Sequence, residues 1–196
     1  MVDAYFWFPS EKYQDFSPIN EQDGAKLSYW DSLTGTPLPH LSRWQPPRLV
    51  PYFPGESNAR KLKPIGDFAS SRNPYLISQN AANVLGDLFE RHGSLYPVIL
   101  EGASQAYFMF VCHTIVNCLD REKSRIKWSP IDPNDVAVVL EPAFHAKALG
   151  DNVIFAVPEV PHCYYVTNAF KERVKKAKLK GLKLSRSWFD SKPWYS

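Results

Sequence analysis

Cysteine is scarce in this 196-residue chain, and its number is odd. Three cysteines, Cys112, Cys118 and Cys163, are too few for a disulfide framework, so we expect reduced thiols. Free cysteines commonly behave as small buried apolar groups. The thiols are therefore expected to pack in the interior.

Long apolar runs are also missing. No stretch approaches the ~18 consecutive apolar residues of a membrane-spanning helix, which excludes such a helix and argues against a membrane partner. Residues 1–7 have no basic cluster and include Asp3, unlike a secretory signal. These absences favour a protein of the cytoplasm.

The common motifs of catalytic and phosphate-binding sites are absent too. The chain has no G-x-x-x-x-G-K-[ST], G-x-G-x-x-G, G-x-S-x-G or H-E-x-x-H. A nucleophile could be built from Cys118, Asp120 and either His113 or His145, but such sets arise by chance in most chains. We therefore expect no catalytic residues and no enzymatic activity.

Metal-ligand spacing is lacking as well. The cysteine–histidine pairs 112–113 and 162–163 are adjacent in sequence, and adjacent residues on a strand point to opposite faces. The sequence therefore predicts no metal site, and nothing in it calls for a cofactor.

Proline is abundant, with 17 residues of which many lie in the first third, and this argues against a long helical bundle. Residues 9–75 read as mostly irregular, with one short strand at residues 48–53. The many aromatic residues there indicate order, because disordered segments are usually poor in large apolar groups. We predict a loop-rich N-terminal layer over residues 1–64 and a body over residues 65–196, or one single domain overall.

Regular elements are predicted mainly in that body. Ser78 is a suitable N-cap for an amphipathic helix over residues 78–92, with Gly93 as a left-handed terminator. A second helix is expected over residues 168–178. Strands are predicted at residues 4–8, 95–101, 106–116, 136–140, 153–157, 163–166 and 182–187, the second and third of these forming an antiparallel hairpin. The fold class is α+β, with a mostly antiparallel sheet and two principal helices.

The net charge of +3 hides an asymmetry. Residues 167–196 carry a net charge of +7 and the rest of the chain −4. The basic helix could serve a nucleic-acid-binding module, which is the alternative function. However, its lysines are spread around the helix and only Arg173 and Arg186 offer guanidinium groups, so a solvated surface is favoured.

A charged turn follows one of the apolar strands. Asp120 and Ser124 enclose Arg121, Glu122 and Lys123. Aspartate and serine side chains hydrogen-bond readily to nearby backbone groups, so we expect them to fix this turn.

Several short segments follow one another along the chain: Gly66-Asp67-Phe68, Leu76-Ile77-Ser78, Leu95-Tyr96-Pro97-Val98, residues 116–124, Val153-Ile154-Phe155, Tyr165-Val166-Thr167 and Gly181-Leu182-Lys183-Leu184. In this order they resemble the bacterial family called immunity protein eleven. The resemblance covers residues 65–187 and implies a non-enzymatic protein that binds a cognate toxin, encoded by the adjacent gene, and blocks it in the cytoplasm of the producing cell. The toxin's reaction differs between relatives.

Tight protein binding usually depends on aromatic and arginine anchors within a polar rim. The chain has 28 aromatic residues, several of them in irregular segments. The candidate partner-binding residues are Trp30, Trp44, Asp120, Arg121, Glu122, Arg173 and Trp188.

Overall fold

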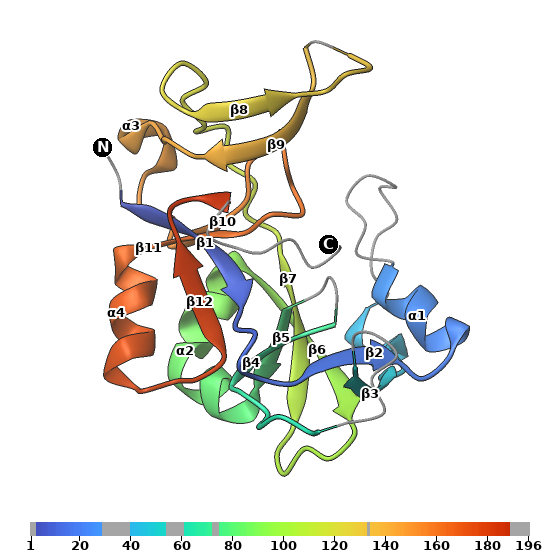
Figure 1. Ribbon diagram of the computed structural model, residues 1–196. Helices are drawn as coiled ribbons and strands as arrows, with labels where there is room; N and C mark the ends of the chain where they lie inside the picture. The colour runs from blue at the N-terminus through green and yellow to red at the C-terminus, as the bar shows by residue number, and fades with distance from the viewer. Residues whose placement is uncertain (1–2, 29–39, 54–60, 72–74, 133, 189–196) are drawn as a thin grey trace. The chain divides into compact units, whose positions relative to one another are not determined.

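The computed structural model describes residues 3–28, 40–53, 61–71, 75–132 and 134–188 (Figure 1). Helices and many strands are present, which confirms the α+β fold class. The chain divides into two compact units. The sheet unit comprises Met1–Phe8, Cys112–Lys176 and Lys183–Ser196, and the barrel unit comprises Pro9–Val111 and Ala177–Leu182.

A four-stranded sheet forms the centre of the sheet unit, in the order β10-β11-β1-β12. The bounds are β10 Ile154–Phe155, β11 Tyr165–Thr167, β1 Ala4–Pro9 and β12 Leu182–Ser185. Strand β1 is the predicted aromatic strand, and it pairs antiparallel with β11, Phe6 opposite Tyr165. The sheet therefore joins the beginning of the chain to its last third.

Two helices and a pair of strands also belong to the sheet unit. Helix α4 (Asn168–Lys176) follows β11 directly and buries Phe170 and Val174. Helix α3 is the single turn Ala146–Leu149. Strands β8 (Arg125–Trp128) and β9 (Val136–Glu141) form an antiparallel pair joined by a loop at one end (Figure 1). Strand β8 and helix α3 were not expected from the sequence.

Aromatic rings fill the core of the sheet unit. The ring of Tyr165 lies 4.9 Å from that of Phe6, 5.1 Å from Phe144 and 5.6 Å from Phe155, measured between centroids. Each large ring buries much apolar area, so a few aromatic residues provide most of the stabilisation of a small core. The buried members of this core include Leu119, Val136, Val139, Leu149 and Val157.

The barrel unit is a closed barrel in the order β2-β3-β6-β7-β5-β4. Its strands are β2 Asp15–Pro18, β3 Arg48–Tyr52, β4 Phe68–Ser70, β5 Tyr75–Ser78, β6 Gly93–Leu100 and β7 Tyr107–Cys112. Leu49, Leu76 and Met109 are fully buried in its core. Strands β6 and β7 are neighbours, as the short connection between them led us to expect.

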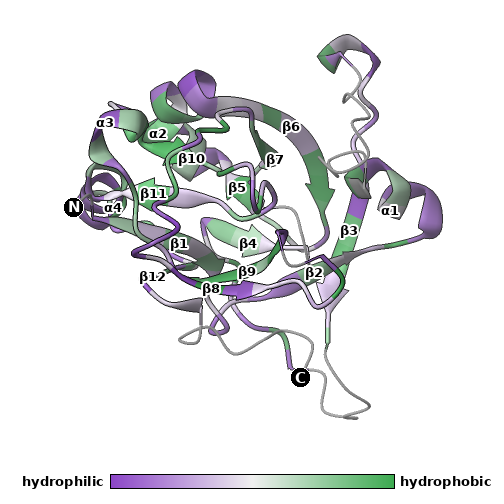
Figure 2. Ribbon diagram, turned by 90° about the horizontal axis from the view of Figure 1, so that it is seen from above, coloured by the Kyte–Doolittle hydropathy of each residue, from purple (hydrophilic) through white to green (hydrophobic). Residues whose placement is uncertain are grey.

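Three helices accompany the barrel: α1 (Glu21–Ser28), the 3-10 turn η1 (Leu41–Arg43) and α2 (Gln79–His92). Figure 2 shows green, apolar colour on β4 and β5 and purple over much of α1. Ser78 caps α2 as predicted, its hydroxyl accepting a hydrogen bond from the Ala81 N–H at 3.0 Å. No helix in the described part of the chain combines the length and apolar character needed to cross a bilayer.

Residues 9–75 contain more regular structure than their prolines suggested. The strand expected at residues 48–53 is β3, but β2, α1 and β4 also lie here, and the barrel uses all three strands. Pro18 is the last residue of β2, where it ends the strand without disrupting it. The boundary predicted after residue 64 falls inside the barrel unit.

The prediction of a left-handed Gly93 is wrong. Its backbone is extended, with φ −175° and ψ −153°, because β6 begins directly where α2 ends. A Cβ atom at this position would lie 2.1 Å from the Val111 carbonyl oxygen and 2.6 Å from the Phe110 ring. Glycine is needed here for close packing, and not for a positive φ.

Candidate functional site

The turn at residues 120–124 is fixed by its own side chains, as the sequence predicts. The Asp120 Oδ1 accepts a hydrogen bond from the Lys123 N–H at 3.1 Å, and the Asp120 carbonyl accepts one from the Ser124 N–H at 2.9 Å. The Asp120 carboxyl is buried and belongs to the turn's interior. The three residues between Asp120 and Ser124 are exposed.

Ser124 ties the turn to the chain that leaves β9. Its hydroxyl accepts a hydrogen bond from the Ala143 N–H at 2.8 Å and donates one to the Ala143 carbonyl at 3.3 Å. The Ala143 carbonyl also accepts from the Asp120 N–H at 2.9 Å. Both ends of the turn are thereby attached to one residue, which limits how far the turn can move.

The side chains of Lys123 and His145 lie close to the Asp120 carboxylate. Lys123 Nζ lies 3.1 Å and His145 Nδ1 3.8 Å from its Oδ2. Burial raises the pKa of Asp120, but the hydrogen bonds from the Lys123 side chain and backbone outweigh it, so the pKa lies below its usual value. The carboxylate therefore stays ionised at neutral pH and keeps its contacts.

Arg121 is held in place by a carboxylate from a distant segment. Its Nε and one terminal nitrogen each lie 3.0 Å from Glu159 Oε1. The Glu159 side chain is only 6% exposed, whereas that of Arg121 is 53% exposed. The guanidinium is thus anchored on one side and open to solvent on the other, where a partner's carboxylate or carbonyl could bind.

The β8–β9 pair follows this turn and is only partly buried. Val136 and Val139 contribute to the core of the sheet unit, and Ile126 packs against that core. At the far end of the pair, Trp128 is 43% exposed and Ile131 is 93% exposed. These two residues were not among the expected site residues; the signal for them in the sequence is an isolated isoleucine within the polar, proline-containing stretch 129–135.

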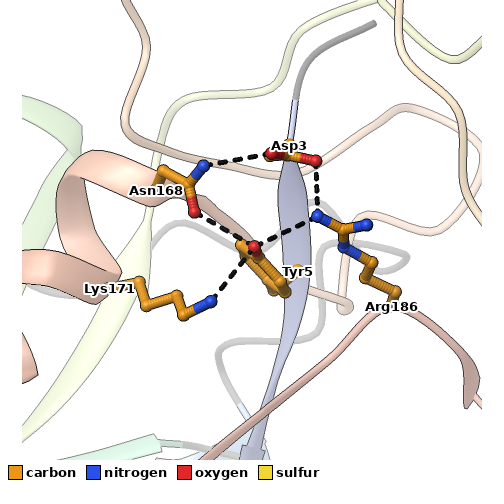
Figure 3. A network of polar contacts seen from close by, with 5 residues as sticks. All are labelled: Asp3, Tyr5, Asn168, Lys171 and Arg186. Atoms are coloured by element: carbon orange, nitrogen blue, oxygen red, sulfur yellow. Dashed lines mark hydrogen bonds and ion pairs between the residues drawn. The ribbon is translucent and has the colours of Figure 1, made fainter.

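A second polar cluster surrounds Tyr5 on β1 (Figure 3). The Tyr5 hydroxyl donates to Asn168 Oδ1 at 3.0 Å and accepts from Lys171 Nζ at 3.2 Å and from an Arg186 nitrogen at 3.4 Å. Arg186 also binds the Asp3 carboxylate at 2.6 Å. Hydrogen bonds from Arg186 and Lys171 lower the pKa of Tyr5. The cluster joins β1 to α4 and to the segment after β12.

This cluster engages two cations of the basic C-terminal region. Besides its hydrogen bond, Lys171 lies over the Tyr5 ring, 4.4 Å from the centroid. Arg173 is half-buried on α4. These contacts leave fewer lysine and arginine side chains available to bind a phosphate backbone. Nucleic-acid binding depends on direct contacts from such side chains.

Two of the three predicted tryptophan anchors lie within the described residues, and both pack against other side chains. Trp44 is buried in the barrel core, and its Nε1 donates to the Pro97 carbonyl at 2.7 Å. Trp188 is half-buried, and its ring packs edge-on against Phe6 with 5.7 Å between the ring centroids. Trp30 lies outside the described residues. The exposed charges of Arg121 and Glu122 are therefore the more accessible candidates.

The thiols are free and have raised pKa values. Cys118 is fully buried, and burial with the nearby Glu159 charge raises its pKa to about 11. Burial raises the pKa of Cys112 and that of Cys163 to about 12. His145 does approach Asp120, but Cys118 offers neither exposure nor a thiolate, which a nucleophile requires. Within the described ranges, no three histidine, cysteine or acidic side chains are grouped as metal ligands.

Comparison with protein-family models gives no match for this chain. Comparison with curated proteins gives none either. The resemblance to immunity protein eleven stays a prediction, and the function must be argued from the surface itself.

Proposed function

We propose that this chain is a non-enzymatic immunity protein that binds and neutralises a cognate bacterial toxin in the cytoplasm. The observation that carries the proposal is the turn at residues 120–124, in which backbone and side-chain hydrogen bonds hold Arg121 and Glu122 at the surface. The segment order that resembles immunity protein eleven includes this same turn.

Binding theory explains why such a turn suits this role. A toxin must be bound before it acts, so the complex must have a high affinity. Affinity falls when loops or long side chains lose conformational freedom on binding. Arg121 has already lost much of that freedom because Glu159 orients it. Arginine is also one of the residue types that most often dominate the energy of protein interfaces.

Co-expression with the toxin encoded by the adjacent gene tests the proposal. Wild-type protein should restore growth, and Arg121→Ala should weaken binding to an inactive form of the toxin at least about tenfold. Arg91→Ala, an exposed arginine of α2 in the barrel unit, is the matched control and should bind like wild type. If cells die as fast with the wild-type protein as without it, the proposal fails.

The basic C-terminal region makes nucleic-acid binding the second candidate function. A module of that kind should bind heparin or mixed DNA and RNA at low salt and release it steeply as salt rises. We expect weak retention, since Lys171 and Arg186 already bind Tyr5 and Asp3. Strong, salt-sensitive retention without toxin binding would favour the nucleic-acid module.

A further inference from the structure

The loop end of the β8–β9 pair combines exposed apolar side chains with negative charge. We define the hairpin tip as residues 128–132, 134 and 135. Ile131 is 93% exposed and Trp128 43% exposed. Asp132 and Asp135 are exposed as well, and the tip holds no lysine or arginine, so its charge is −2.

Several hydrogen bonds join side chains and backbone groups within the tip. The Ser129 hydroxyl accepts from the N–H groups of Ile131 and Asp132 at 3.2 and 3.4 Å. Asp132 Oδ1 accepts from the Asn134 N–H at 2.9 Å, and Asp135 Oδ1 accepts from the Val136 N–H at 3.1 Å.

Two backbone hydrogen bonds also join residues of the tip. The Ser129 N–H donates to the Asp135 carbonyl at 2.9 Å, and the Asp135 N–H donates to the Asp132 carbonyl at 3.0 Å. Pro130, immediately before Ile131, has a restricted φ. These bonds restrict the backbone around the exposed Ile131, which lowers the entropy cost of inserting it into a partner.

We propose that the hairpin tip inserts Ile131 and Trp128 into an apolar pocket on the toxin, rimmed by cationic side chains. This inference rests on the proposed function and identifies the partner's binding surface. Burying an isoleucine that is almost fully exposed provides the apolar gain. The two aspartates supply the electrostatic complement, since each keeps one carboxylate oxygen beyond the one that caps the loop.

The negative charge of the hairpin tip favours a cationic protein pocket over a second copy of the chain or an anionic membrane surface. Two copies of the tip would bring four carboxylates together, and like charges across an interface cost binding energy. An anionic membrane surface would repel the same carboxylates, because such surfaces attract basic segments. A cationic rim around an apolar pocket satisfies both features of the tip.

Binding of the inactive toxin, measured by surface plasmon resonance, tests the inference. Ile131→Asp should weaken binding at least about tenfold, which corresponds to about 1.4 kcal/mol. The control is Ile115→Asp, the same change at an isoleucine of the sheet unit that is 51% exposed, and it should bind like wild type. Thermal unfolding of both variants checks that they fold.

A second variant tests the electrostatic part without removing the loop's hydrogen bonds. In Asp132→Asn with Asp135→Asn, the amide oxygens can still accept the capping N–H groups, but both charges are gone. Its association rate should fall, and the decrease of that rate with added salt should become shallower.

The outcomes are distinct. If wild type does not bind the toxin, the proposed function and this inference both fail. If wild type binds and Ile131→Asp binds equally well, or Ile115→Asp loses as much, the inference fails while the function stands. If sedimentation shows that the chain alone dimerises and Ile131→Asp abolishes the dimer, the tip binds a second copy and the inference is overturned.

Discussion

At the residue scale, two glycines in or beside one helix have opposite roles. Gly93 follows α2 and faces the Val111 carbonyl and the Phe110 ring so closely that no Cβ fits. Gly86 lies within α2, and a Cβ there would meet no atom within 4 Å. The same substitution should therefore have opposite effects at the two positions.

We expect Gly93→Ala to lower the free energy of unfolding by about 3 kcal/mol, because the backbone of β7 would have to shift. Gly86→Ala should raise it by about 0.5–1 kcal/mol, since alanine favours the helix and restricts the unfolded chain. Urea denaturation followed by circular dichroism measures both. A stabilising Gly93→Ala would show that the β6–β7 contact is looser than described.

At the element scale, the chain's own turn chemistry could be predicted, whereas its long-range partners could not. Asp120 and Ser124 were recognised as turn-fixing residues from their types and spacing, and the structure confirms the bonds. The Arg121–Glu159 contact joins residues 38 positions apart, which no local pattern encodes. The hairpin tip was missed because one isoleucine in a polar loop has no periodicity.

The Ser124 contacts lead to a prediction for this element. Ser124→Ala removes both hydrogen bonds to Ala143 and should lower the free energy of unfolding by about 1–2 kcal/mol. Ser104→Ala, in an exposed turn of the barrel unit, is the control and should change it by less than about 0.5 kcal/mol. Equal effects in urea denaturation would mean that Ser124 does not tie the turn.

At the scale of the whole molecule, the order of elements along the chain does not follow the two units. The aromatic strand β1 and helix α2 were predicted because their signals are local. The barrel was not, because β3 pairs with β6 through Leu49 and Leu100, and composition alone does not reveal such partners. Proline content led the sequence analysis to read residues 9–75 as loops, although they supply three barrel strands.

The inner position of β1 in its sheet gives a prediction at this scale. A variant lacking residues 2–8 loses the strand between β11 and β12, so amides of the sheet unit should exchange at least about tenfold faster. Amides of β5 and β7 in the barrel unit should keep their protection. Hydrogen exchange read by mass spectrometry distinguishes the two, and equal loss in both units would show that they unfold together.

The pairing of β1 with β11 also affects how the chain is made. Tyr5 pairs with Val166, which lies 161 positions later, so the partner of the first strand leaves the ribosome long after it. At usual synthesis rates of about 5–20 residues per second, the delay is on the order of 10–30 s. During that time the aromatic strand has no partner strand, so it is prone to aggregation while the chain is being made.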